Sequence, residues 1–141
     1  MKSTQTPTGW MIRLELGEEL VQKLTEFCEQ NSVEAGWISG IGGATKARVG
    51  YYNLSRKKYI FRSVKDVREL VSLQGNVSRI GDKVALHLHG VVTDSNNKPR
   101  GGHINELIVG GTCEVYIQTF DKSLQRQIDP EIGLPLLTLE D

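Results

Sequence analysis

Apolar and polar residues alternate over most of this chain, with the period of two that is typical of strands burying one face. Seven segments follow this pattern, and a short return strand is expected at residues 58–61. The seven segments are residues 10–16, 35–41, 48–54, 70–80, 83–93, 103–109 and 112–120. Glycine and asparagine separate them at the spacing of antiparallel hairpins. We therefore predict a mainly antiparallel sheet of about seven strands.

One segment follows a helical period instead. Between Glu18 and about Gln30 the apolar residues fall on a single stripe with a period of 3.6 residues. These residues are Leu20, Val21, Leu24, Phe27 and Cys28. Glu18 and Glu19 lie in the expected first turn, where the helix dipole favours negative charge. One main helix covering a face of the sheet indicates the α+β class.

The two ends of the chain lack both patterns. Residues 1–9 are polar and include Pro7 and Gly9, so we expect a flexible N-terminal arm before a single domain at residues 10–141. After Asp121, prolines favour an irregular extension. The N-terminus lacks the apolar segment of a signal peptide, and no apolar run of about 18 residues occurs, so we expect a cytoplasmic protein without membrane contact.

The composition is that of a globular domain. Charged residues make up 24% and hydrophobic residues 38% of the 141 residues, and the formal net charge is zero. This balance gives no overall attraction to nucleic acid or to a membrane. Cys28 and Cys113 lie far apart in the chain and are expected to be reduced thiols, with Cys28 in the core.

All three histidines of the chain lie within one predicted hairpin. Alternate residues of a strand share a face, so His87 and His89 point away from the core face that carries Leu88. The polar turn between the two strands is centred on Asn96. A symmetric hairpin therefore places His103 directly opposite His89, with Cβ atoms about 5 Å apart.

The same register places Asn105 opposite His87, although a bulge at Gly101 and Gly102 would shift it. Three imidazoles on one face can close on one ion, because Zn–N bonds are about 2.0–2.1 Å long. Three histidines with a vacant fourth position are typical of an open zinc site, so we expect zinc or another divalent transition metal. The alternative is a polar cluster at a subunit interface that titrates near pH 6.5.

Two carboxylates, Asp94 and Glu106, are nearest to the histidines in sequence. If the centre is catalytic, we expect metal-activated water with Glu106 or Asp94 as the general base. Each of these carboxylates is more often a turn residue or a solvated charge. They remain candidate catalytic residues, and the reaction itself is not specified by the sequence.

A glycine-rich segment extends from Ser39 to Thr45, but it matches neither of two common nucleotide-binding motifs. A dinucleotide site needs a third glycine at the position of Thr45 and a following helix, whereas strand-like sequence follows here. A P-loop would need Gly-Lys-Ser or Gly-Lys-Thr, which is absent. The glycines more simply allow close backbone packing. The alternative is that Gly40 and Gly42 line a surface pocket.

A basic stretch extends from Lys46 to Arg68 and has a local charge of about +7. Tyrosine and phenylalanine residues are interleaved with the cations, so the stretch could bind a nucleic-acid backbone or another anion. The residues singled out for this contact are Arg48, Arg56, Lys57, Lys58 and Arg62. The alternative is the solvated face of a hairpin whose aromatic residues point inward.

Several short motifs, taken in order, resemble the PPC (plant and prokaryote conserved) domain family. They are Gly40-Ile-Gly, Gly50-Tyr-Tyr, Glu69-Leu-Val-Ser-Leu-Gln-Gly-Asn-Val77, His87-x-His89, Gly101-Gly-His-Ile104 and Glu114-Val-Tyr-Ile117. The resemblance extends from about Trp10 to Pro135. It implies an α+β fold that assembles as a homotrimer, and a metal site at His87, His89 and His103.

The chain departs from the plant members of this family, which carry DNA-binding AT-hooks. The segment Lys98-Pro-Arg-Gly101 has similar residue types in a different order, inside a predicted turn. The chain is thus similar to the stand-alone prokaryotic type. We expect a homotrimer with a three-histidine metal site and a small-molecule or regulatory role. The alternatives are DNA binding through the stretch from Lys46 to Arg68, and a trimeric scaffold for other proteins.

Overall fold

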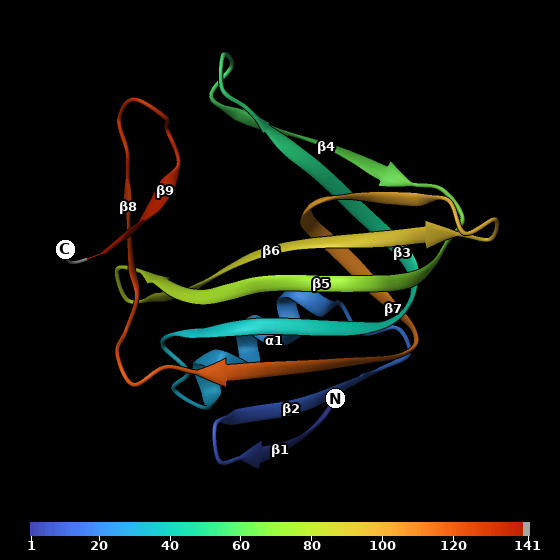
Figure 1. Cartoon of the computed structure of the whole chain (residues 1–141), viewed down its shortest axis with the longest axis horizontal. Helices are drawn as coiled ribbons and strands as arrows, with labels where there is room; N and C mark the ends of the chain where they lie inside the picture. The colour runs from blue at the N-terminus through green and yellow to red at the C-terminus, as the bar shows by residue number, and fades with distance from the viewer. Residues whose placement is uncertain (140–141) are drawn as a thin grey trace.

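The computed structural model describes residues 1–139 and contains one nine-stranded sheet (Figure 1). The strands are β1 (Lys2–Thr6), β2 (Gly9–Glu15), β3 (Gly36–Asn53), β4 (Lys58–Val64), β5 (Val67–Ile80), β6 (Lys83–Asp94), β7 (Pro99–Thr119), β8 (Gln125–Ile128) and β9 (Pro135–Thr138). All pairs are antiparallel except β5 with β8. The mainly antiparallel sheet with one helix agrees with the prediction, but about seven strands was too few.

Two long, bent strands, β3 and β7, organise the sheet. Each was predicted as two separate strands, because glycines interrupt the alternation in the middle. The backbone instead continues through register shifts near Gly42 and Ala44, where the β3–β7 pair bends. β7 pairs with β3, β3 with β5, β5 with β6, and β6 again with β7. These four strands therefore form a closed ring.

The helix α1 (Leu20–Gln30) packs against β6 and β7 (Figure 1). Its N-cap is Glu19, whose carboxylate accepts hydrogen bonds from the backbone N–H groups of Val21 and Gln22 at 3.2 and 2.6 Å. The same carboxylate accepts a bond from the N–H of Leu107 on β7 at 3.0 Å, which ties the helix to the ring. The predicted apolar stripe is confirmed, since Leu20, Leu24, Phe27 and Cys28 are buried. No helix in the described residues is long and apolar enough to cross a membrane.

The core lies between the helix and the closed ring of strands. Its fully buried side chains include Leu24, Leu73, Leu88 and Leu107. Cys28 and Cys113 are both free, and Cys28 lies in the core, as predicted; Cys113 is buried as well. Burial raises the pKa of the Cys28 thiol to about 12, so this sulfur stays protonated and behaves as a small apolar side chain.

The first residues form strand β1 rather than the loose arm expected from their polarity. Lys2–Thr6 pairs with β2 in register, with Lys2 opposite Arg13 and Thr6 opposite Gly9. The N-terminal ammonium contacts the carboxylate of Glu18 at 2.7 Å. A polar, threonine-containing segment suits an edge strand, because one of its faces stays in solvent.

The tail forms a second hairpin, β8–β9, where an irregular extension was predicted. Pro130 lies in the turn, and Pro135 is the first residue of β9, a position where a missing N–H is tolerated. The backbone N–H of Arg79 donates to the carbonyl of Leu124 at 2.7 Å, and the Tyr52 hydroxyl donates to the carbonyl of Ile132 at 2.8 Å. These bonds hold the hairpin beside the end of β5 and the start of β6 (Figure 1).

Candidate metal centre

The three histidines come from two neighbouring strands of the ring. His87 and His89 lie on β6, and His103 lies on β7. The parity prediction is confirmed, since the alternate residue Leu88 is 1% exposed in the core while His89 is exposed and His87 is half-buried. His103 is likewise half-buried. The sequence pattern that buries Leu88 thus aims both β6 histidines away from the core.

The predicted register is confirmed at one pair and wrong at the next. His89 pairs with His103, as turn symmetry requires. His87 does not face Asn105, because β6 and β7 separate beyond that pair and His87 faces Asn76 of β5 instead. β7 turns to pair with β3, and Asn105 is the residue that this β3–β7 pairing skips. The bulge considered at Gly101 and Gly102 is absent from the β6–β7 pairing, and the register shift at Asn105 belongs to the β3–β7 pairing.

Gly102 sets the backbone that presents His103. Its φ is +148°, a value that residues with a side chain rarely adopt. A Cβ atom there would lie 2.4 Å from the carbonyl oxygen of Gly50, so β7 could not approach β3 as closely. A glycine directly before His103 is therefore needed for the position of that imidazole.

The imidazole rings converge on a small volume. One ring nitrogen from each of the three histidines lies within 4.8 Å of the others. The Nε2 atoms of His87 and His89 are 3.2 Å apart. On the outer side the Tyr59 ring, from β4, lies 4.5 Å from the His103 ring between centroids, and Phe61 stacks on Tyr59. Two aromatic rings thus lie close to the His103 ring.

The surroundings favour the neutral form of His87 and His103. Burial, with smaller contributions from His87 and His89, lowers the pKa of His103 to about 4. Burial also lowers the pKa of His87, and the nearby charge of Arg126 acts in the same direction. Neutral imidazoles offer lone pairs to a cation, which is the protonation state that metal binding requires.

The donor set fits a transition metal such as zinc. An ion about 2.0–2.1 Å from each nitrogen places the nitrogens about 3.4 Å apart in a tetrahedral site, a separation that His87 and His89 already approach. All three ring nitrogens lie within 4.8 Å of one another, so binding one ion would draw them closer together. Within residues 1–139, Nδ1 of His103 is the one buried side-chain nitrogen or oxygen without a hydrogen-bond partner. A buried nitrogen without a partner is costly, and a metal ion would satisfy it.

Neither of the two candidate catalytic carboxylates joins the histidines among the described residues. The Asp94 carboxylate accepts hydrogen bonds from the N–H groups of Asn96 and Lys98 at 2.9 and 3.0 Å, so it stabilises the β6–β7 turn. Glu106 forms an ion pair with Lys46 at 2.8 Å on the sheet surface. Both carboxylates have structural partners of their own.

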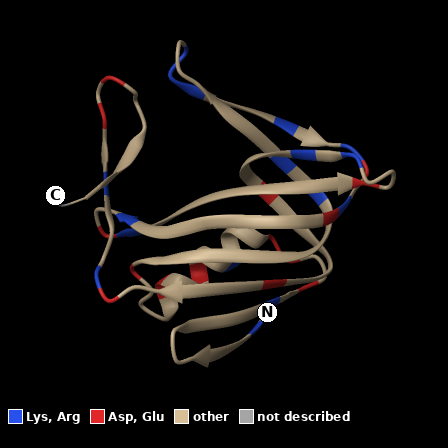
Figure 2. Cartoon of the chain, in the orientation of Figure 1, with Lys and Arg blue, Asp and Glu red and all other residues tan. Residues whose placement is uncertain are grey.

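The basic residues separate into two groups at opposite ends of the β3–β4 hairpin (Figure 2). Arg56, Lys57 and Lys58 occupy its tip, where the Lys57 ammonium donates to the carbonyl of Pro130 at 3.0 Å. Along the strands, the Arg48 guanidinium lies 5.5 Å from the centre of the Phe61 ring. The predicted stretch is therefore not one continuous patch.

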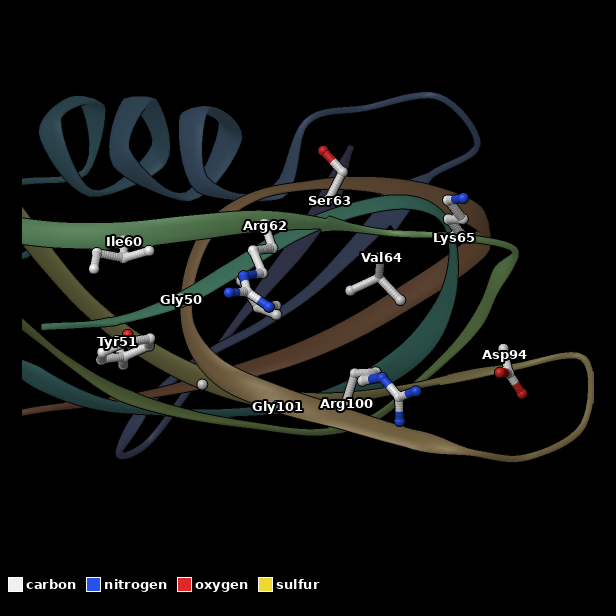
Figure 3. A pocket seen from close by; sticks show the side chains of 12 residues that line it. Gly50, Tyr51, Ile60, Arg62, Ser63, Val64, Lys65, Asp94, Arg100 and Gly101 are labelled. Carbon is white, nitrogen blue, oxygen red and sulfur yellow. The ribbon is translucent and has the colours of Figure 1, made fainter.

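The second group lines the largest cavity described, of about 670 Å³ (Figure 3). Arg62 of β4 and Lys65, the residue after β4, contribute two cations to the lining. Arg100 of β7 contributes a third. Asp94 is the one acidic residue in its lining. Arg100 was not part of the predicted patch, since only the pairing of β6 with β7 brings it here.

The residue that sequence analysis missed is Arg126 of β8. It lines a second cavity together with His87 and His103. Its strand is only four residues long and follows a segment that reads as irregular, so no periodicity signals its position. Only the folded tail hairpin places this cation beside the histidines.

Comparisons with known proteins agree with this architecture. A structure from Ralstonia eutropha JMP134, described as that of a candidate DNA-binding protein, is 31% identical with a TM-score of 0.92, covering 99% of this chain and 96% of that chain. A metal-containing protein from Archaeoglobus fulgidus is 29% identical with a TM-score of 0.84, covering 99% of this chain and 100% of that chain.

One curated relative is much longer. The bifunctional protein GlmU from Synechococcus sp. (strain JA-3-3Ab) is 26% identical over 141 residues, a match that covers 95% of this chain and spans only 21% of that relative. The model of the Plants and Prokaryotes Conserved (PCC) domain matches residues 1–121. Because this match takes in most of the chain, as the motifs had indicated, the protein belongs to the Plants and Prokaryotes Conserved domain family.

Proposed function

We propose that this protein is a metal-binding domain in which His87, His89 and His103 hold one divalent transition metal, with zinc as the expected ion. Two observations carry the proposal: one ring nitrogen from each of the three imidazoles lies within 4.8 Å of the others, and the buried Nδ1 atom of His103 has no hydrogen-bond partner in residues 1–139. The similar A. fulgidus protein, described as metal-containing, supports it. A zinc ion held by three histidines would keep a fourth position for water or a small molecule.

The surroundings of the centre favour a role with a small molecule, in binding or in regulation. Tyr59 and Phe61 shield His103 from bulk water on one side. A cavity of about 240 Å³ adjoins His87 and His103 on another side. This volume is below the range of about 300–1,000 Å³ that is usual for drug-sized ligands, so we propose a ligand of a few heavy atoms.

Elemental analysis of protein purified without an affinity tag tests the metal. After zinc supplementation and dialysis, we expect about one zinc ion per chain, and loss of that zinc in a His89→Ala variant. His89 is exposed, so its replacement leaves the core intact. A Gln74→Ala variant is the matched control, because Gln74 of β5 pairs with His89 of β6 and is not one of the proposed metal ligands. Wild-type protein without metal, or zinc retained in His89→Ala, would contradict the proposal.

A second candidate is DNA binding, supported by the description of the R. eutropha relative and by the cations Arg62, Lys65 and Arg100 at one cavity. DNA affinity should then fall with salt, and an Arg62→Ala/Lys65→Ala variant should reduce the slope of log K against log salt by about 2. An Arg56→Ala/Lys57→Ala/Lys58→Ala variant tests the hairpin tip separately. Salt-independent or absent binding would exclude this candidate.

We also propose, from the family resemblance, that the chain assembles as a homotrimer. Light scattering coupled to gel filtration would give a mass of three chains, each of 15.7 kDa. A monomer mass would contradict this. A trimer that binds neither metal nor DNA would instead favour the scaffold alternative.

A further inference from the structure

The small cavity beside the histidines has an unusual lining. Two of the three histidines, His87 and His103, line it together with Arg126. The remaining lining is mainly apolar and includes Leu86 and Leu136. Among the lining residues Arg126 is the one cation at neutral pH, and none is acidic. The cavity therefore combines a single positive charge with an apolar wall.

Three hydrogen bonds fix the guanidinium of Arg126. Its Nε–H donates to the hydroxyl oxygen of Ser78 at 2.7 Å, and an Nη2–H donates to the side-chain oxygen of Asn76 at 2.8 Å. An Nη1–H donates to the carbonyl of Pro135 at 2.8 Å. Ser78 is itself buried and donates to the carbonyl of Ala85 at 3.0 Å. The side chain is thus oriented before any ligand arrives.

Arg126 has no carboxylate within ion-pair distance among residues 1–139. Its three acceptors are all neutral oxygens, which leaves two of the five N–H groups of the guanidinium unused. Burial lowers the pKa of Arg126, which reflects the cost of removing its charge from water. An anion bound in the cavity would offset that cost.

Arg126 is also connected to the histidines through the sheet. Asn76, which accepts from its guanidinium, is the residue of β5 that pairs directly with His87 of β6. Directly opposed residues in a sheet project on the same face. Arg126 and the metal-site face of β6 therefore border one space.

We propose that this cavity binds a small organic carboxylate, with the carboxylate on the Arg126 guanidinium and the apolar body against Leu86 and Leu136. Guanidinium and carboxylate form paired, charge-assisted hydrogen bonds, and the unused N–H groups can serve them. The apolar lining favours a ligand with a hydrocarbon body over a bare inorganic anion. The inference rests on the proposed function, because it names the ligand class of the same centre.

An NMR titration of ¹⁵N-labelled, metal-free protein tests this proposal without involving a metal. With benzoate we expect a saturable shift of the Arg126 Nε–H signal and a Kd on the order of 1 mM, typical of a ligand of this size. Benzamide, which is neutral and nearly the same shape, should bind at least about tenfold more weakly. Inorganic phosphate should also bind more weakly than benzoate, because it has no apolar body.

Variants separate Arg126 from other cations. Arg126→Gln should weaken benzoate binding about tenfold or more, and Arg126→Lys should weaken it less, because it keeps the charge without the paired geometry. Arg62→Gln, in the larger cavity, is the control and should leave the benzoate Kd unchanged. Because Arg126 also contacts Pro135, folding of its variants is checked by amide spectra, while the ligand comparison on wild-type protein needs no variant.

The outcomes distinguish this inference from the proposed metal site. Benzoate binding at Arg126 in a protein that takes up no zinc would refute the metal site alone. Stoichiometric zinc without any shift of Arg126 by benzoate would refute the carboxylate site alone. Equal binding of benzoate and benzamide, or of benzoate and phosphate, would also overturn the proposal.

Discussion

The cavity beside the histidines and the larger cavity under the β3–β4 hairpin both contain cationic side chains, but they hold these cations differently. Arg126 makes three hydrogen bonds to protein oxygens, and His103 is half-buried against Tyr59. In the larger cavity Arg62 and Lys65 are exposed. An exposed cation costs little to leave unpaired, whereas a partly buried cation carries a desolvation cost that a bound anion would offset.

The comparison also concerns charge. Burial keeps the pKa values of His87 and His103 below their ordinary value, so these two imidazoles are in the form that coordinates a metal. The larger cavity carries net positive charge and is suited to attract an extended anion through solvent. The two regions therefore predict different responses to mutation, to pH and to salt.

The largest expected effect comes from breaking the backbone that presents His103. Gly102→Ala introduces a Cβ 2.4 Å from the Gly50 carbonyl oxygen at a φ of +148°, so we expect a loss of about 2–4 kcal/mol in the free energy of unfolding. Zinc affinity should fall with it, because the imidazole moves. Urea unfolding and zinc titration measure the two effects.

The matched control is Gly81→Ala in the β5–β6 turn. Its φ is also positive, at +59°, but a Cβ there meets no atom within 4 Å. We expect a loss of about 1 kcal/mol and unchanged zinc affinity. Equal effects of the two substitutions on zinc affinity would show that Gly102 has no special role at the centre.

A smaller effect is expected from pH on the metal-free protein. The pKa of His103 is about 4 when folded, below the ordinary value of 6.5, so the unfolded chain takes up a proton first on acidification. The contribution of His103 to stability is thus present above pH 6.5 and is lost as the pH falls towards 4. Urea unfolding in EDTA at pH 7.5 and pH 5 should show a drop for wild type that is smaller in His103→Gln. An equal drop in both proteins would contradict this assignment.

The smallest effect is expected in the larger cavity. An Arg62→Ala/Lys65→Ala variant removes two exposed cations, so the free energy of unfolding should change by no more than about 0.5 kcal/mol. Zinc content should stay at the wild-type level. Loss of zinc in this variant would show that the larger cavity and the histidine centre are coupled. It would contradict the view that the two regions act independently.

Strand parity and turn symmetry were enough to predict the histidine cluster, because they depend only on local spacing. They placed His87 and His89 on one face and His103 opposite His89, as observed. They failed at Asn105, because β7 leaves β6 to pair with β3, and this exchange of partners depends on tertiary structure. The prediction of β3 and β7 as two strands each had a local cause, because glycines interrupt the alternation of each strand in the middle.

The tail was the other failure, and it matters for the site. Residues 125–128 and 135–138 are short and flanked by prolines, so their local sequence does not indicate strands. They are held by contacts from distant residues, such as the bond from Tyr52 to the carbonyl of Ile132. Arg126 could therefore not be assigned to the centre before the fold was known.

The most direct test of the central claim is X-ray absorption spectroscopy at the zinc edge on zinc-loaded wild-type protein. We predict a four-coordinate site with three imidazole nitrogens at about 2.0–2.1 Å and one oxygen ligand from water or a bound anion. The imidazole scattering should drop by one ring in His103→Ala, if zinc is retained at all. A spectrum dominated by oxygen ligands without imidazole scattering would contradict the assignment of His87, His89 and His103 as the metal site.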